Sequence, residues 1–398
     1  MISVEEAQTR LLELVSPLKP VAVPISSAGG LVLGADQFAG HDQPPFDASA
    51  MDGYALRRAD VVLGTTLRQV GISAAGAPFE GRLSEGETVR IFTGGAVPEA
   101  ADMVLIQENV SAEGGMITVT DADQAQDYIR KRGQDFQRGD RVAEGKYLSA
   151  AANSLLAGMG IAKLPCHPAP QIAIIATGDE LVDPGGELTP GAIYASNSYG
   201  LKAAFEAAGA QARILPIARD THDALQRVFL MAQDADLIVT SGGASVGDHD
   251  LVMPVAKSLG LSSEFHRVRM RPGKPLMAGR FSDGPAFVGL PGNPVSALVC
   301  AEVFVAPMIR KMRGLTDVMP RFGRAELQED LPENGPREHY MRATATFQDK
   351  NVTVRAFDRQ DSALSSVMAA ANALIRRAPD APPIAAGAQV DVLLLTKV

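Results

Sequence analysis

Strand-like and helix-like segments alternate along residues 171–300, and this alternation limits the possible folds more than any other feature of the chain. The expected elements are strands at 171–176, 212–218, 237–240 and 285–290, and helices at 199–208, ended by Gly209, and at 221–233, capped by Thr221. Such alternation is typical of a doubly wound parallel sheet with helices on both faces. A long last helix follows, and Pro307 should kink or interrupt it.

The rest of the chain has a different character. Ser3 and Glu6 fit a capping box before a helix that reaches about Val15. Short β-like runs broken by Gly and Pro predict a β-rich region, and they cover 67–72, 87–92, 103–110 and 116–120. A helix is expected at 149–157, ended by Gly158. The proline-rich segment 163–170 is interpreted as a linker and domain boundary. Further strands, at 342–347, 352–357 and 390–396, predict a small C-terminal β-domain.

Composition excludes several classes of protein. The formal net charge is −9, and no long basic run or aromatic–basic interleaving occurs, so nucleic acid is not an expected partner. The two cysteines, Cys166 and Cys300, are far apart and form no C-x-x-C pair, which indicates free thiols. No apolar run approaches the roughly 18 residues of a membrane span, and the first residues do not resemble a signal peptide. We therefore expect a cytoplasmic protein without a membrane partner.

Glycines follow the expected strands in three turns. Backbone N–H groups that converge in such turns bind oxyanions, and a helix start adds the positive end of its dipole. Asn293 stands where a helix N-cap would be, and Pro294 stands at the first helical position. The alternative is that these are plain turns. The candidate anion-binding residues are Thr177, Gly178, Ser241, Gly242, Gly243, Ser245, Gly247, Pro291, Gly292, Asn293 and Pro294.

Charged side chains lie next to these turns. Asp179 and Glu180 follow the first turn, and Asp248 and Asp250 follow the second. Carboxylates beside a phosphate site are explained if a divalent cation bridges the two. The acidic residues could instead shape turns or face solvent.

A basic cluster precedes the third turn. Its cations are Arg267, Arg269, Arg271 and Lys274, and Pro272 and Pro275 stiffen the backbone between them. Arginine forks and a lysine point charge suit an anion clamp. The alternative is a solvated charged loop. Residues 42–54 combine prolines, carboxylates and small residues without periodicity, so physical reasoning alone predicts only a rigid surface loop.

That last segment carries a resemblance to a known family. Residues 44–55, Pro-Pro-Phe-Asp-Ala-Ser-Ala-Met-Asp-Gly-Tyr-Ala, resemble the signature of the MoeA family of molybdopterin molybdenumtransferases, which are related to the E domain of gephyrin. Further blocks resemble the family in the expected order, and they cover 90–98, 101–102, 177–182, 197–201, 241–247, 290–294 and 336–342. The resemblance therefore spans nearly the whole chain.

The resemblance implies an α/β plus β fold in an elongated, multidomain homodimer. The implied parts are a discontinuous N-terminal mixed domain (1–37 and 133–168), an inserted β-rich domain (38–132), a doubly wound α/β molybdopterin-binding domain (169–318) and a C-terminal β-barrel-like domain (319–398). The active site is expected between the α/β domain of one subunit and the β-rich domain of the other.

The resemblance also implies an activity. Family members release AMP from adenylyl-molybdopterin and place molybdate on its dithiolene, with Mg²⁺. Asp52 and Thr93 match family positions in the inserted domain, and Lys274 matches a basic position. The matching acidic positions, expected to hold the metal, are Glu180, Asp220 and Asp250. The matching substrate-side positions are Asn197, Ser198, Pro291 and Pro294, with Arg269 and Arg271 as further candidates for molybdate. The family usually has Lys where this chain has Arg271, which keeps the charge and changes the shape.

Three other interpretations remain open at this point. A molybdopterin adenylyltransferase shares the α/β domain, although a smaller chain with a Thr-Gly-Gly-Thr-Gly-like loop is expected for it. A non-catalytic scaffold, as the E domain of gephyrin can be, belongs to another class, and the retained Glu180 and Asp250 argue against it. A paralogue with an altered role is also compatible with the sequence. Expected partners are the adenylyltransferase and molybdoenzyme acceptors.

Overall fold

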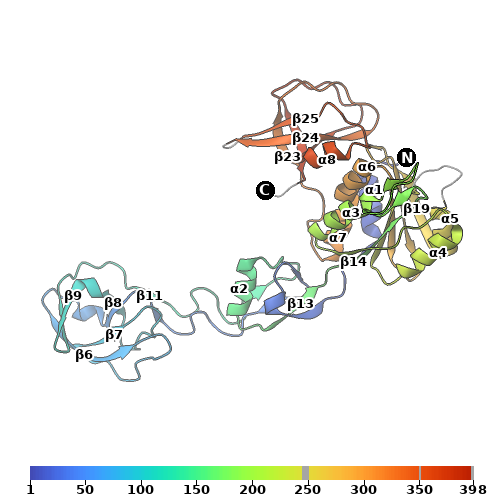
Figure 1. Cartoon of the computed structure of the whole chain (residues 1–398). Coiled ribbons are helices and arrows are strands. Elements are labelled where there is room, and N and C mark those ends of the chain that lie inside the picture. Colours follow the sequence, from blue (N-terminus) through green and yellow to red (C-terminus); the bar gives the residue numbers. More distant parts are fainter. Residues whose placement is uncertain (244–250, 349–350, 396–398) are drawn as a thin grey trace. The chain divides into compact units, whose positions relative to one another are not determined.

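The computed structural model describes residues 1–243, 251–348 and 351–395 (Figure 1). The chain divides into two compact units. The first contains Met1–Val21, Leu31–Gly34 and Cys166–Val398, and the second contains Ala22–Gly30 and Ala35–Pro165. Among the described residues, no helix has both the length and the apolar composition needed to span a bilayer.

A six-stranded sheet forms the centre of the first unit. Its strands, in spatial order, are β17 (Gln211–Ile214), β14 (Gln171–Ala176), β18 (Leu237–Ser241), β22 (Ala286–Leu290), β21 (Pro275–Phe281) and β19 (Leu261–Arg267). The first four are parallel, which confirms the predicted doubly wound sheet, and β21 and β19 extend it in antiparallel fashion. Because the first strand in the chain lies between the second and the third, the topology reverses between β14 and β18. Ligands of such sheets bind at the carboxyl ends beside this reversal.

Helices cover both faces of this sheet. Along β14, Ile172 and Ile174 pack into one core with α3 (Ser196–Ala207) and α7 (Ala306–Met312). Ala173 and Ile175 pack into a second core with α4 (His222–Met231) and α5 (Val252–Ser258). Alternate side chains of a strand point to opposite faces, so a continuous apolar run is the pattern of a strand buried on both sides.

The predicted interruption of the last long helix is confirmed. The helix runs from α6 (Pro294–Cys300) through a π-helical segment η4 (Ala301–Val305) into α7. Pro307 has no N–H to donate to the carbonyl of Val303, four residues earlier. The buried side-chain amide of Gln8, on α1 (Val4–Glu13), donates to that carbonyl instead at 3.1 Å. The N-terminal helix is therefore fixed to the α/β core, with Ala7 and Leu11 buried in it.

The C-terminal region closes into a barrel, as expected. The barrel runs through β24 (Glu338–Gln348), β25 (Asn351–Ala356), β23 (Gly323–Leu327), β27 (Gln389–Leu394) and β26 (Ala373–Arg377), and β26 pairs back with β24. The short strand β20 (Met270–Arg271) pairs with β24 in parallel, and α8 (Ser365–Ala370) lies between β25 and β26 in the chain.

The second unit contains the expected β-rich region. Its main sheet has the order β8 (Met103–Ile106), β5 (Gly53–Leu56), β7 (Glu87–Ile91), β6 (Thr66–Ser73), β10 (Met116–Val119) and β9 (Val110–Glu113). The run 103–110 forms two strands rather than one, since a short 3₁₀ turn separates β8 from β9. The helix expected at 149–157 is present as α2 (Ala150–Gly158), and Ser149 is its N-cap rather than its first residue. The other short strands of this unit are β3 (Gln37–Phe38), β4 (Ala48–Ser49), β11 (Ile129–Arg130) and β12 (Arg141–Val142), and β1 (Val21–Pro24) begins at its boundary. The short strands β2 (Val32–Leu33), β15 (Leu181–Val182) and β16 (Ile193–Tyr194) belong to the first unit.

The prediction of a linker at 163–170 is wrong for its first half. Lys163–His167 forms strand β13, in which Leu164 and Cys166 are buried at alternate positions. Cys166 pairs with Leu33 of β2 in antiparallel register. The prolines concealed this period-two pattern, because proline normally argues against a strand. The four-part division of the sequence stays a prediction.

Candidate functional site

The ends of β14 and β18 meet where the sheet topology reverses. The backbone N–H of Thr177 donates to the carbonyl of Ser241 at 3.1 Å. Gly242 has φ of +97°, and a Cβ there would lie 2.6 Å from the Thr177 carbonyl oxygen. Glycine is therefore required by both conformation and space. The predicted turns that follow β14 and β18 therefore lie next to each other.

Asn197 joins these turns to the third one. Its side-chain nitrogen donates to Ser241 Oγ at 2.9 Å and to the carbonyl of Gly292 at 2.8 Å. The N–H of Gly242 donates to the carbonyl of Leu290 at 3.2 Å. The structure thus brings together at one edge of the sheet the three turns that the sequence offered separately.

The start predicted for the helix at 199–208 is wrong by three residues. The expected helix began at Tyr199, whereas α3 begins at Ser196, with Asn197 and Ser198 in its first turn. Asn and Ser are typical capping residues, so the sequence favoured a later start. Here the residue before the helix is Ala195, whose side chain cannot cap. The consequence is that Asn197 projects from a helix start toward the glycine turns.

Two buried hydroxyls lie at this edge without a hydrogen-bond partner among the described residues. They are Thr177 Oγ1 and Ser198 Oγ. Thr177 Oγ1 would be 2.9 Å from a Cβ placed on Gly242, so it lies directly against the second turn. Buried polar groups are nearly always paired with protein, water or ligand, so these donors are available to a bound oxyanion.

The third turn differs from the expected helix-start site. Asn293 occupies the N-cap position, but its side chain donates to Ser362 Oγ at 3.0 Å instead of capping the helix. The N–H of Val295, in the first turn of α6, donates to the carbonyl of Ser362 at 3.2 Å. One of the N–H groups that were expected to face an anion therefore already donates to another part of the protein. Pro294 stands at the first helical position, as predicted, and Pro291 is buried.

The carboxylates beside the first turn lie on two linked loops. The N–H of Gly178, which has φ of +147°, donates to the carbonyl of Ala218 at 3.2 Å. Asp179 Oδ1 accepts from the N–H of Asp220 at 3.2 Å. Glu180 and Asp220 thus belong to adjoining turns at the carboxyl edge, and Glu180 is exposed.

Other predicted site residues fall outside the described part of the chain. They are Ser245, Gly247 and Asp250. Within residues 1–243, 251–348 and 351–395, no three His, Cys, Asp or Glu side chains form a cluster that could hold a metal.

The predicted basic clamp is larger than the sequence indicated. Arg271 pairs with His339 in the β20–β24 ladder, and the guanidinium of Arg342 is fully buried nearby. Arg342 Nη2 donates to the carbonyl of Asp361 at 3.1 Å, while its Nε and Nη1 have no partner among the described residues. Burial, together with the charge of Arg271, lowers the pKa of Arg342 to about 10. A buried arginine with unpaired donors is a strong candidate for an oxyanion.

The pKa of His339 is lowered by the same concentration of positive charge. Burial lowers its pKa to about 3, and the charges of Arg271, Arg342, Arg377 and Arg337 add to the effect. The imidazole is therefore neutral over the physiological range. Sequence reasoning did not select Arg342 as a site residue, and the available signal was its place at the end of the family-like block 336–342.

The four cations that the sequence predicted for the clamp, Arg267, Arg269, Arg271 and Lys274, are all exposed. Arg269 and Lys274 flank a turn in which the N–H of Val268 donates to the carbonyl of Lys274 at 3.0 Å. This turn leads into β21, which begins at Pro275.

In the second unit, the structure pairs the two residues that the family resemblance selected. Asp52 Oδ1 accepts from both the N–H and Oγ1 of Thr93, each at 2.8 Å. These two hydrogen bonds, with the charge of Arg90, hold the pKa of Asp52 below its usual value. The following Gly53 starts β5, and a Cβ there would lie 2.1 Å from the carbonyl oxygen of Leu105. The loop predicted to be only a rigid surface segment therefore holds a fixed, ionised carboxylate.

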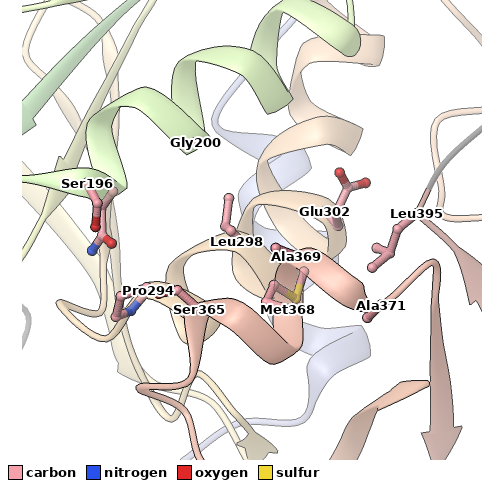
Figure 2. A pocket seen from close by; sticks show the side chains of 11 residues that line it. Ser196, Gly200, Pro294, Leu298, Glu302, Ser365, Met368, Ala369, Ala371 and Leu395 are labelled. Carbon is pink, nitrogen blue, oxygen red and sulfur yellow. The ribbon is translucent and has the colours of Figure 1, made fainter. Parts of the chain in front are cut away.

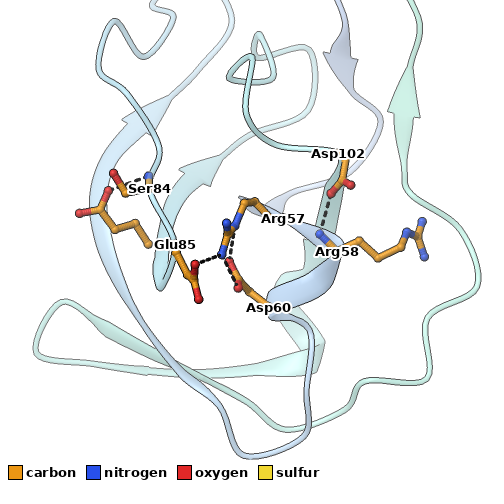
Figure 3. A network of polar contacts seen from close by, with 7 residues as sticks. Arg57, Arg58, Asp60, Ser84, Glu85 and Asp102 are labelled. Carbon is orange, nitrogen blue, oxygen red and sulfur yellow. Dashed lines mark hydrogen bonds and ion pairs between the residues drawn. The ribbon is translucent and has the colours of Figure 1, made fainter.

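A second polar network in this unit has a structural role (Figure 3). Arg57 pairs with Asp60 at 2.8 Å and with Glu85 at 3.5 Å. Asp102 accepts from the N–H of Arg58 at 2.6 Å. These contacts fix the turn that follows β5, so the matched block at Ala101–Asp102 stabilises this domain.

Comparisons with known proteins agree with this arrangement. Residues 2–160 match the MoeA N-terminal region (domain I and II), residues 173–311 match a probable molybdopterin binding domain, and residues 324–395 match the MoeA C-terminal region (domain IV). The chain is 37% identical to molybdopterin molybdenumtransferase 2 of Mycobacterium tuberculosis, with 100% of each chain covered. It is 36% identical to molybdopterin molybdenumtransferase of Haemophilus influenzae, covering 79% of this chain and 78% of the relative.

Solved structures give the same result. A crystal structure of the molybdopterin biosynthesis MoeA protein from Pyrococcus horikoshii covers 100% of both chains, with a TM-score of 0.83 and 27% sequence identity. The matched regions, the full-length relatives and the shared architecture all indicate the same family. This chain belongs to the MoeA family of molybdopterin molybdenumtransferases.

Proposed function

We propose that this protein acts in molybdenum cofactor biosynthesis as a molybdopterin molybdenumtransferase. It takes adenylyl-molybdopterin, inserts molybdate into the dithiolene and releases AMP. The observation that carries the proposal is the junction at Asn197, which holds the Ser241 and Gly292 turns together beside Thr177. A phosphorylated nucleotide conjugate needs such a convergence of N–H and hydroxyl donors.

The glycine turns would hold the phosphate groups of the substrate. Gly178 and Gly242 permit close approach of the backbone, and Thr177 and Ser198 offer buried hydroxyls. Pro291 and Pro294 fix the third turn, in which Gly292 and Asn293 are exposed. Ser245 and Gly247, which lie outside the described residues, are proposed as further contacts to the substrate. These contacts orient the phosphoanhydride that is cleaved.

The basic clamp would collect molybdate. This substrate is a tetrahedral dianion. The exposed guanidinium of Arg271 would offer bidentate donors, and the buried guanidinium of Arg342 would add positive charge beside it. Neutral His339 adds no repulsion against these cations. Arg269 and Lys274 would draw the anion in from solvent as exposed charges.

Glu180, Asp220 and Asp250 would hold Mg²⁺. The linked turns that carry Glu180 and Asp220 fit this ion, because Mg²⁺ is usually bound by one or two carboxylates plus substrate phosphates. The ion supplies neutralisation of charge on the phosphoanhydride. The protein's own contribution is to aim exposed carboxylates at the edge where the glycine turns lie.

The active site would be completed in a homodimer. Asp52, fixed by Thr93, would act from the β-rich domain of one subunit on substrate held by the α/β domain of the other. The proposed setting is the cytoplasm, with a molybdopterin adenylyltransferase supplying substrate and molybdoenzymes accepting the product.

The test is to mix the purified protein with adenylyl-molybdopterin, Mg²⁺ and molybdate and to measure AMP. Wild-type protein should release AMP only when molybdate is present. Glu180→Ala should lose most of this activity, whereas Glu187→Ala, another exposed acidic residue, should keep it. AMP release that does not depend on molybdate would overturn the proposal, and so would activity that needs ATP and free molybdopterin.

A further inference from the structure

A pocket of about 350 Å³ opens beside the glycine turns, on the side of α3, α6 and α8 (Figure 2). Its lining is mostly apolar, with Leu298 from α6 and Met368 from α8 among the side chains that face it. Asn197 and Pro294 belong both to this lining and to the phosphate-binding edge described above. The pocket is therefore a direct continuation of that edge.

Glu302 is the acidic side chain in this lining. It projects from the π-helical segment η4, and such segments are frequent at functional sites. Burial raises the pKa of its carboxyl group, against the opposing effect of Arg310, and no hydrogen bond contributes to the shift. A carboxyl group that is partly removed from water and lacks a hydrogen-bonding partner in the described chain is costly unless a ligand pairs with it.

The chemistry of this pocket selects one kind of ring. A carboxylate accepts two parallel hydrogen bonds from adjacent N–H donors. The pyrimidine part of a pterin presents such a pair, a ring N–H beside an exocyclic amino group. Adenine presents an amino donor beside a ring-nitrogen acceptor, which a carboxylate would repel. The flexible thioether of Met368 suits contact with an aromatic face.

We propose that this pocket binds the pterin ring of the substrate, with the Glu302 carboxylate accepting from its adjacent ring N–H and amino groups. The inference rests on the proposed function, because it assigns one end of the same substrate. The shared residues Asn197 and Pro294 place the ring next to the turns that hold its phosphate. The volume lies at the lower end of the range for ligand pockets, of the order of 300 to 1,000 Å³, which fits a bicyclic ring. Glu302 then determines specificity for pterin over adenine.

The experiment titrates the full-length protein with a pterin that carries a phosphorylated hydroxymethyl side chain and follows pterin fluorescence. Glu302→Gln keeps the shape of the side chain and removes the charge, and it should weaken binding at least about tenfold. Glu206→Gln is the matched control, since Glu206 lies exposed on α3 and pairs with Lys202 at the surface. The control should bind the pterin as the wild type does. The affinity for AMP should be unchanged in Glu302→Gln.

A second variant tests the pocket itself. Ala369 lines it from α8 and is exposed, so Ala369→Trp fills the space without displacing core residues, and it should also weaken pterin binding at least about tenfold. Equal pterin affinity in wild type, Glu302→Gln and Ala369→Trp would overturn the inference, and so would a wild type that does not bind the pterin. AMP release separates the two proposals. Wild-type protein that binds the pterin through Glu302 but releases no AMP would overturn the proposed function alone.

Discussion

The side-chain nitrogen of Asn197 lies 2.9 Å from Ser241 Oγ, and this contact joins the start of α3 to the end of β18. The same nitrogen lies 2.8 Å from the carbonyl oxygen of Gly292. One amide therefore sets the spacing between two glycine turns that are distant in sequence.

Replacing Asn197 with Ala should separate substrate binding from folding. The variant loses both hydrogen bonds, and because Asn197 is only partly buried the free energy of unfolding should fall by no more than about 1–2 kcal/mol. The KM for adenylyl-molybdopterin should rise at least about tenfold, since the turns are no longer held together. Asn197→Asp tests the donor requirement and should behave like the Ala variant. The KM is measured from steady-state AMP release. An unchanged KM in both variants would contradict the proposed role of Asn197.

Replacing Gly242 with Ala should destabilise the protein strongly. The new Cβ would lie 2.6 Å from the Thr177 carbonyl oxygen, at a φ of +97° that side chains rarely adopt. We expect a loss of more than about 2 kcal/mol in the free energy of unfolding. Gly185→Ala is the control, because Gly185 has φ of +93° with open space around it and should lose only about 1 kcal/mol. Equal losses in a urea titration would show that close approach at Gly242 does not matter.

The contact between Gln8 and Val303 predicts a stability effect far from the site. Gln8→Leu removes the donor and leaves the carbonyl of Val303 buried and unpaired, which should cost about 1–3 kcal/mol. Thr9→Ala, next to it on the exposed face of α1, serves as the control and should change stability by less than about 0.5 kcal/mol. Chemical denaturation measures both. A Gln8→Leu protein as stable as the wild type would mean that this carbonyl finds another donor.

His339 predicts a pH dependence of stability. Its pKa is about 3 in the folded protein, because of burial and the surrounding arginines, and about 6.5 when unfolded. Below pH 6.5 the unfolded chain takes up a proton that the folded chain does not. The free energy of unfolding should therefore fall by up to about 1.4 kcal/mol per pH unit as the pH drops from 6.5 toward 3, and this contribution is complete above pH 6.5.

His339→Gln isolates this contribution. The variant lacks the titrating group, so its unfolding free energy should fall less steeply than that of the wild type between pH 6.5 and 4.5. His222→Gln is a suitable control, because His222 is exposed at the start of α4. Parallel slopes for wild type and His339→Gln would contradict the assignment of a neutral, buried imidazole.

The sequence predicted the fold well where periodicity was strong. The alternation after Gln171 identified the sheet, Thr221 caps α4 as expected, and the helix expected at 149–157 is present as α2. The predicted boundaries are wrong where the local residue types favoured a different structure. Prolines hid strand β13, and capping residues inside α3 shifted its predicted start to Tyr199.

The candidate site was predicted in pieces that only the topology assembles. Thr177, Ser241 and Gly292 are far apart in the chain, and no spacing rule joins them before the strand order is known. Arg342 lies in strand β24 and Glu302 in the long last helix, and no motif in the sequence singled out either as a site residue. Their significance comes from burial, which depends on how the barrel and the last long helix pack, and single-sequence patterns do not record that packing.

The central claim is that the glycine turns around Asn197 hold a phosphorylated pterin nucleotide whose cleavage depends on molybdate. The most direct measurement is the AMP released by purified wild-type protein from adenylyl-molybdopterin with Mg²⁺, in the presence and absence of molybdate. We expect release with molybdate, little without it, and at least about tenfold less at subsaturating substrate for Asn197→Ala. Equal release with and without molybdate, or an Asn197→Ala protein as active as wild type under those conditions, would contradict the account.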